Sequence, residues 1–180
     1  YNSTKSHNVH IVTKNIEPFF GSYYLIMQKI NKYDVLDQNS RTPLMTALEN
    51  CNDDIILTEL INVSNCNIQN LDGNTALMTI IEKKIVSFQV LKELMVRTDV
   101  NIQNKFGYTA LMMAVRFSNF DRTGKIIKLL APLTDCNLKC KKGWTALMIA
   151  VRYSNSNSTE ETVKILAPLT NCNLQDEDGW

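Results

Sequence analysis

The chain has 180 residues, of which 44% are hydrophobic and 21% charged, and its formal net charge is +1. This composition is typical of a folded protein and excludes both a wholly disordered chain and a uniformly basic nucleic-acid-binding protein. No apolar run approaches the roughly 20 residues of a membrane-spanning helix, and residues 1–10 lack the apolar core of a secretory signal. The five Cys are too dispersed for a disulfide framework, so we expect a reducing compartment, the cytoplasm.

Residues 1–33 are polar at their start and contain both histidines of the chain, His7 and His10. An H-x-x-H pair can bind a metal, but no third ligand stands at a suitable spacing, so we favour surface histidines. No other His could serve as the base for a Ser or Cys nucleophile. Only Tyr23 to Ile30 follows the phase of the pattern described next, and we expect residues 1–33 to form a degenerate N-terminal repeat or cap.

From residue 34 onward a tetrapeptide, Thr-Ala-Leu-Met or Thr-Pro-Leu-Met, occurs four times, with spacings of 33, 34 and 36 residues. The copies begin at Thr42, Thr75, Thr109 and Thr145. A Gly stands two residues before Thr in three copies, where the first copy has Ser40. An Asn stands eight residues before Thr in the same three, where the first has Asp34. Such a period indicates a repeat protein, because each short unit can bury its apolar face only against its neighbours.

Each copy predicts two helices. The Thr can cap the first helix, which runs from Thr42 to about Asn50 in the first copy, and the preceding Gly predicts a tight turn. A second apolar stretch with helical spacing follows in every copy and, in the last two copies, ends at Pro132 and Pro168. The last two copies have longer predicted loops between their helices, at residues 116–124 and 152–161.

These segments resemble the ankyrin repeat, as in residues 71–78 (LDGNTALM) and 105–112 (KFGYTALM). The resemblance implies an all-α fold, an ankyrin-repeat α-solenoid of stacked helix-turn-helix units. The expected repeats are residues 34–66, 67–100, 101–136 and 137–172, and residues 173–180 begin a further, truncated repeat. Met45, Met78, Met112 and Met148 replace the family's His, so we expect packing to replace the hydrogen bonds of that side chain.

No pattern in the chain predicts an enzyme. Phosphate-binding glycine motifs are missing from the sequence. Cys136 and Cys140 form only half of a zinc site, and Cys66, Cys136 and Cys172 share a repeat position with Val100, which favours buried packing. We therefore expect no catalytic residue, metal, cofactor or small-molecule substrate.

The resemblance implies a non-catalytic scaffold that binds another protein on its concave face, chiefly within residues 101–172. By repeat phase, the expected partner-binding residues are Lys105, Phe106, Tyr108, Met113, Arg116, Phe117, Lys141, Lys142, Trp144, Ile149, Arg152 and Tyr153. Residues 34–82 carry one basic and eight acidic side chains, whereas residues 101–153 carry nine basic and two acidic ones. We therefore expect a partner with an acidic or amphipathic segment. For Tyr108 and Trp144 the alternative is packing against the neighbouring turn.

Three other functions remain open. The chain could be the targeting module of a larger enzyme or ubiquitin-ligase adaptor, since Gly179-Trp180 stops just short of the next Thr and predicts more chain. It could be a structural component of a viral assembly, in the host cytoplasm or virion. Its Asn- and Ile-rich sequence, with segments such as Gly-Trp-Thr-Ala-Leu-Met, resembles ankyrin proteins of giant viruses or protists. The weakest alternative is binding of a nucleotide or single-stranded nucleic acid by Tyr108, Trp144 and the Lys cluster. We expect no membrane association.

Overall fold

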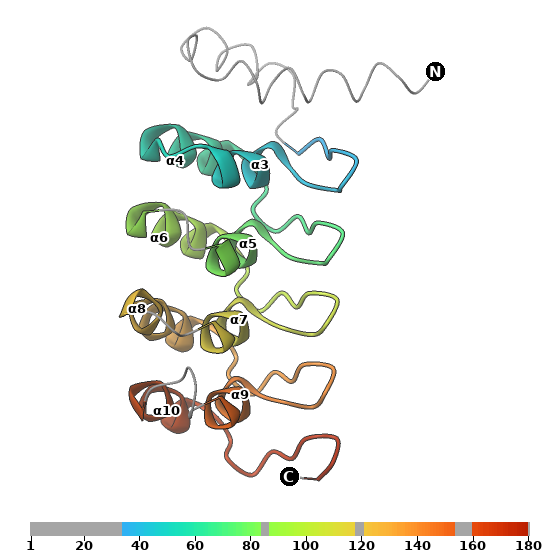
Figure 1. Cartoon of the computed structure of the whole chain (residues 1–180), viewed down its shortest axis with the longest axis vertical. Coiled ribbons are helices and arrows are strands. Elements are labelled where there is room, and N and C mark those ends of the chain that lie inside the picture. The colour runs from blue at the N-terminus through green and yellow to red at the C-terminus, as the bar shows by residue number, and fades with distance from the viewer. Residues whose placement is uncertain (1–33, 84–86, 118–120, 154–159, 180) are drawn as a thin grey trace, which may run out of the picture. The chain divides into compact units, whose positions relative to one another are not determined.

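A computed structural model describes residues 34–83, 87–117, 121–153 and 160–179, and the histidines and expected cap of residues 1–33 lie outside these ranges. Throughout the described ranges the regular structure is helical, which confirms the all-α prediction (Figure 1). The chain divides into two compact units, Tyr1–Thr98 and Asp99–Trp180, called unit 1 and unit 2. None of the described helices is long and apolar enough to cross a membrane.

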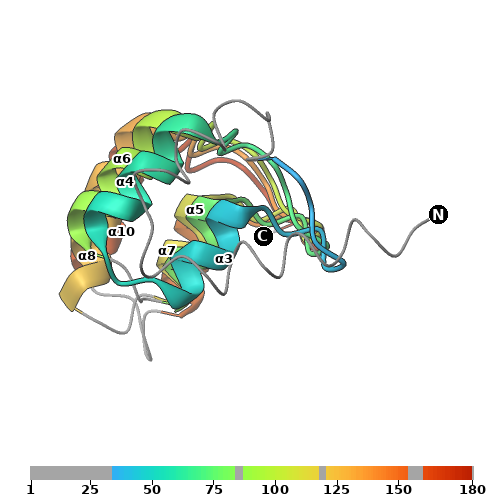
Figure 2. The ribbon, with the colours of Figure 1, turned by 90° about the horizontal axis from the view of Figure 1, so that it is seen from above.

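In its described residues, unit 1 contains two stacked helix pairs. The first pair is α3 (Pro43–Asn50) and α4 (Asp54–Val63), and the second is α5 (Ala76–Lys83) and α6 (Phe88–Arg97). The inner helices α3 and α5 contact each other, as do the outer helices α4 and α6. Each pair is preceded by a turn that projects away from the outer helix (Figure 2).

Unit 2 has the same plan. Its helices are α7 (Ala110–Arg116) and α8 (Asp121–Leu130), followed by α9 (Ala146–Arg152) and α10 (Glu160–Leu166). Inner helix α7 contacts α9, and outer helix α8 contacts α10. Short 3-10 helices, η1 (Ala131–Leu133) and η2 (Ala167–Leu169), continue α8 and α10. The prolines therefore end the α-helices where the sequence predicts, because they cannot donate the next α-helical hydrogen bond.

The phased Thr begins each inner helix. Thr42 Oγ1 accepts a hydrogen bond of 3.2 Å from the backbone N–H of Met45, and Thr109 Oγ1 accepts one of 3.2 Å from Met112. The same bond joins Thr75 to Met78 and Thr145 to Met148. In the first three copies the Met side chain is fully buried, as expected from packing.

The phased Gly is required by conformation and by space. Gly107 and Gly143 have φ values of 77° and 75°. A Cβ on Gly107 would lie 2.7 Å from the backbone nitrogen of Lys141, and one on Gly143 would lie 2.6 Å from that of Glu177. Successive turns in unit 2 therefore approach too closely for any side chain at this position.

One predicted loop differs from the structure. Helix α8 begins at Asp121 and includes Gly124, so the first long loop ends earlier than predicted. Apart from its chain neighbours and the backbone of its own helix, no atom lies within 4 Å of a Cβ added at Gly124, so close packing does not require a Gly there. The second long loop ends at Glu160, close to its predicted limit.

Candidate functional site

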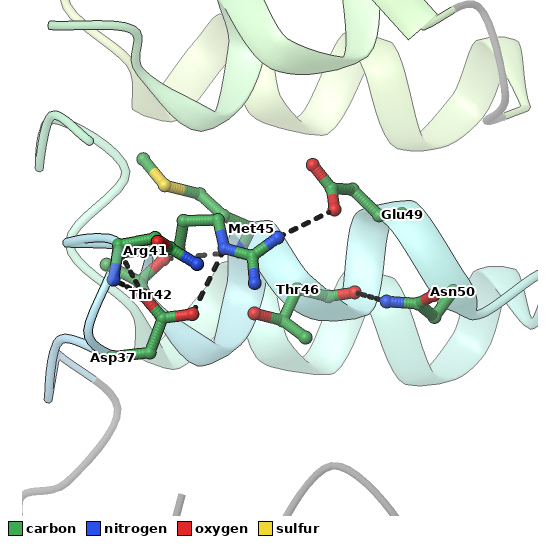
Figure 3. A network of polar contacts seen from close by, with 8 residues as sticks. Asp37, Arg41, Thr42, Met45, Thr46, Glu49 and Asn50 are labelled. Carbon is green, nitrogen blue, oxygen red and sulfur yellow. Dashed lines mark hydrogen bonds and ion pairs between the residues drawn. The ribbon is translucent and has the colours of Figure 1, made fainter. Parts of the chain in front are cut away.

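In the first, third and fourth repeats, the side chains at two positions, one just before the inner helix and one in its last turn, contact each other. One position immediately precedes the capping Thr, and the other is seven residues after it. In the first repeat they hold Arg41 and Glu49, whose Nη1 and Oε2 atoms lie 3.1 Å apart (Figure 3). Asp37 in the preceding turn also contacts Arg41, with 3.0 Å between Oδ2 and Nε. This pair of positions in unit 1 is thus internally neutralised.

Asp37 also organises the turn of the first repeat. Its Oδ1 accepts hydrogen bonds of 2.8 Å and 2.9 Å from the backbone N–H groups of Asn39 and Arg41. Burial by itself would raise the pKa of Asp37, but these hydrogen bonds and the Arg41 guanidinium outweigh it and lower the pKa below its ordinary value. The carboxylate is therefore charged at neutral pH.

In the third repeat, the same two positions hold Tyr108 and Arg116. The guanidinium carbon of Arg116 lies 5.5 Å from the centroid of the Tyr108 ring and 5.9 Å from that of Phe117. Burial raises the pKa of the Tyr108 hydroxyl and outweighs the opposing effect of Arg116, so the ring is neutral at physiological pH. The arginine is held by aromatic faces, in cation–π contacts that do not neutralise its charge.

In the fourth repeat, the two positions hold Trp144 and Arg152. The guanidinium carbon of Arg152 lies 5.1 Å from the centroid of the Trp144 ring, and Lys142 Nζ lies 5.3 Å from it. Trp144 Nε1 donates a 3.0 Å hydrogen bond to Asp176 Oδ2 in the next turn. That bond fixes the indole ring and, through it, the two cations above the ring.

The charges at these positions differ between the two units. Within the described ranges, no ion pair joins Arg116 or Arg152 to a carboxylate, whereas Arg41 contacts two. Three exposed lysines, Lys105, Lys141 and Lys142, stand at the turns of unit 2. Unit 2 therefore presents cations held on aromatic rings, an arrangement that suits carboxylates of a ligand.

Comparison with known proteins identifies the repeat. Residues 84–178 match the sequence profile of ankyrin repeats in three copies. The chain belongs to the ankyrin repeat family. No curated protein matches the chain as a relative.

Two solved ankyrin structures have the same fold. One is EF0377, an ankyrin repeat protein, with a TM-score of 0.70 and 21% identity over 97% of this chain and 87% of that one. The other is an ankyrin repeat domain from Acinetobacter baumannii AYE, with a TM-score of 0.73 and 21% identity over 96% of this chain and 86% of that one. At this identity the likeness concerns the fold alone.

Two of the expected partner-binding residues are buried. The side chains of Met113 and Ile149 are only 6% and 0% exposed, so neither can contact a partner. Both lie in the middle of an inner helix, and α7 and α9 contact each other. We therefore leave both out of the interaction surface.

The remaining expected residues line the turns and the ends of α7 and α9. Phe106 is 61% exposed at its turn, and Phe117 and Tyr153 are half-buried at the ends of the inner helices. We call this set the unit 2 surface, which comprises Lys105, Phe106, Tyr108, Arg116, Phe117, Lys141, Lys142, Trp144, Arg152 and Tyr153. Tyr108 and Trp144 are each half-buried, and each ring supports an arginine.

The phased Asn has a structural role that repeat counting did not reveal. Asn101 Oδ1 accepts a 2.8 Å hydrogen bond from the backbone N–H of Asp135, and Asn137 accepts one of 2.7 Å from Asn171. Asp34 makes the equivalent bond with Asn65 in unit 1. Since an Asn or Asp recurs at this position, a side chain that bonds the start of a repeat to its end could have been inferred from its spacing.

Lys139 belongs to this scaffold too. Its Nζ donates a 2.7 Å hydrogen bond to the carbonyl oxygen of Gln175, just as Gln103 donates one of 2.9 Å to that of Lys139. This lysine therefore joins successive repeats and is not part of the unit 2 surface.

The cysteines are structural where they are buried. Burial raises the pKa of Cys66 and of Cys136, and each thiol donates to a carbonyl oxygen near the end of an outer helix. Cys172, at the same position, is exposed. Among the described residues, no group of three or more His, Cys, Asp or Glu could hold a metal ion.

Proposed function

We propose that the chain is a non-catalytic protein-interaction module that binds an acidic segment of a partner on the unit 2 surface. The observation that carries the proposal is the replacement of the Arg41–Glu49 ion pair by Tyr108–Arg116 and Trp144–Arg152. An arginine stacked on a ring retains its charge and its N–H groups, which match a carboxylate in shape.

The ring contacts also reduce the entropic cost of binding. A free arginine side chain loses up to about 2 kcal/mol of rotamer entropy when a partner immobilises it. Arg116 and Arg152 already rest on aromatic rings, so less of this freedom remains to be lost on binding. The lysines at the turns add long-range attraction, which mainly raises the association rate.

Nucleic acid is the weaker ligand for this surface. A nucleobase needs an open ring face on which to stack, and here the rings of Tyr108 and Trp144 already carry Arg116 and Arg152. A steep decrease in oligonucleotide binding with salt, together with affinity above that for acidic peptides, would favour nucleic acid instead.

Partner capture from the native cell tests the proposal. The double variant Arg116→Ala/Arg152→Ala should lose most of the proteins that the unaltered chain retains. The control variant Lys92→Ala/Lys125→Ala removes the same charge from exposed positions on outer helices α6 and α8 and should retain them. Equal loss in both variants, or no loss in either, would contradict the proposed surface, provided that circular dichroism shows both variants folded.

A further inference from the structure

The two stacked arginines stand at equivalent positions on neighbouring helices. Arg116 is the last residue of α7 and Arg152 is the last residue of α9, and these helices contact each other within unit 2. Packed helices lie about 8–10 Å apart, axis to axis. The two arginine positions, which we call the arginine row, are therefore separated by about that distance.

That separation selects one ligand conformation. A polyproline II helix has three residues per turn and a rise of about 3.1 Å per residue, so every third side chain recurs on one face after about 9 Å. In a β-strand the same face recurs every second residue, after about 6.6 Å. In an α-helix, side chains three or four residues apart are only about 5–6 Å apart. Of these short repeats, that of polyproline II matches the arginine row.

We infer that the unit 2 surface recognises an acidic polyproline II segment in which carboxylates recur at every third residue. This inference rests on the proposed function and specifies the partner. One carboxylate binds Arg116 and the next binds Arg152. Lys105 and Lys141, also one repeat apart, extend the positive charge to the turns beside the arginine row.

The next turn marks the end of this site. Asp176, Glu177 and Asp178 occupy the positions that Cys140, Lys141 and Lys142 hold one repeat earlier. Asp176 is bound to Trp144, and Glu177 and Asp178 are exposed. A third ligand carboxylate in this direction would meet like charge. The recognised core is therefore short, with two carboxylates separated by two residues.

Peptide titrations test the spacing. A fluorescein-labelled peptide Gly-Pro-Glu-Pro-Pro-Glu-Pro-Gly places the carboxylates three residues apart, and the residue order Gly-Pro-Pro-Glu-Glu-Pro-Pro-Gly places them side by side. We expect fluorescence polarisation of the full chain at about 50 mM salt to show tighter binding of the spaced peptide. The difference should be roughly two- to five-fold, since one exposed ion pair is lost.

Variants assign that preference to the arginines. Arg116→Gln should reduce the affinity for the spaced peptide to that for the adjacent one, while Lys125→Gln, on the outer helix α8, should retain the preference. Arg116→Lys keeps the charge but loses the planar fork, so we expect an intermediate affinity.

Three results would overturn the inference. These are equal affinity for both peptides, a spacing preference that survives Arg116→Gln, and tighter binding of a helical peptide with Glu residues seven positions apart. Partner capture separates this failure from that of the proposed function. If Arg116→Ala/Arg152→Ala loses its partners but the spacing of the two peptide carboxylates has no effect, the proposed interaction surface is supported and the polyproline II geometry is rejected.

Discussion

At the scale of single residues, one acceptor position organises the turns of the first three repeats. Asn70 and Asn104 each accept two backbone N–H bonds within their own turn, and Asp37 does the same in the first repeat. The fourth repeat has Cys140 at this position, and a thiol is only a weak acceptor. The turn that supports Trp144 is thus less well bonded than its counterparts.

Cys140→Asn should therefore stabilise the protein. The new amide oxygen can accept from the backbone N–H groups of Lys142 and Trp144, as Asn104 does from Phe106 and Tyr108. We expect the free energy of unfolding to rise by about 0.5–1.5 kcal/mol, measured by urea denaturation. Cys140→Ala, which cannot accept these bonds, is the control and should lower it. A decrease with Asn as large as with Ala would contradict this account of the turn.

The charge of Asp37 predicts acid sensitivity. Because its pKa is lowered in the folded chain, its stabilising contribution is complete above the unfolded carboxyl pKa of about 3.9 and is lost as the pH falls through the folded pKa. Asp37→Asn keeps an acceptor for the turn, as Asn70 shows, but removes the titration. Urea denaturation at a series of pH values should show a shallower loss of stability at acid pH in the variant. Identical pH profiles would contradict the assignment.

At the scale of elements, the sequence predicts the inner helices well and their surroundings less well. The phased Thr predicts the starts of α3, α5, α7 and α9, because an N-cap is a local signal that needs no tertiary contact. The sequence predicts a loop at Gly124, which lies in α8, because a helical Gly resembles a helix breaker in sequence.

The candidate surface was only partly predictable for a related reason. Every residue of α7 from Ala110 to Val115 is buried, so apolar periodicity could not distinguish Met113 from a surface position. The Tyr108–Arg116 contact depends on how the turn folds back on the helix end, and residue spacing alone does not encode that path. Charge, by contrast, was visible in the sequence because it is a property of composition.

Two glycines of unit 2 should respond oppositely to the same substitution. Gly143→Ala places a Cβ 2.6 Å from the backbone of Glu177 at a positive φ, so the turns must separate. Gly124→Ala fills open space in α8 and should raise the free energy of unfolding by about 0.5–1 kcal/mol. We expect Gly143→Ala to lower it by at least about 1–2 kcal/mol, again by urea denaturation. Similar effects at both sites would contradict the close contact between turns.

At the scale of the whole molecule, charge is segregated along the sequence. Residues 34–82 are strongly acidic and residues 101–153 strongly basic, although the chain as a whole carries a net charge of only +1. An acidic partner is therefore repelled by unit 1 and attracted by unit 2. The net charge of the whole chain therefore does not reveal which unit attracts an acidic partner.

Reversal of two turn lysines tests that attraction. Lys141→Glu/Lys142→Glu should weaken binding of an acidic partner markedly, mainly through a slower association rate, and the effect should diminish at high salt. Surface plasmon resonance at low and high salt measures both quantities. Lys92→Glu/Lys125→Glu, on outer helices, provides the matched charge control. Unchanged affinity at low salt would refute a role for these lysines.

Asn101 and Asn137 accept hydrogen bonds from main-chain N–H groups at the end of their own repeats, and a main-chain group can donate whatever side chain its residue carries. The bonds that hold each repeat together therefore do not depend on the side chains at the surface. The double variant Tyr108→Arg/Arg116→Glu gives the third repeat the ion pair of the first. It should remove the positive charge of one half of the arginine row and leave the fold intact. The residues that contact a ligand can thus be exchanged without changing the hydrogen bonds that hold each repeat together.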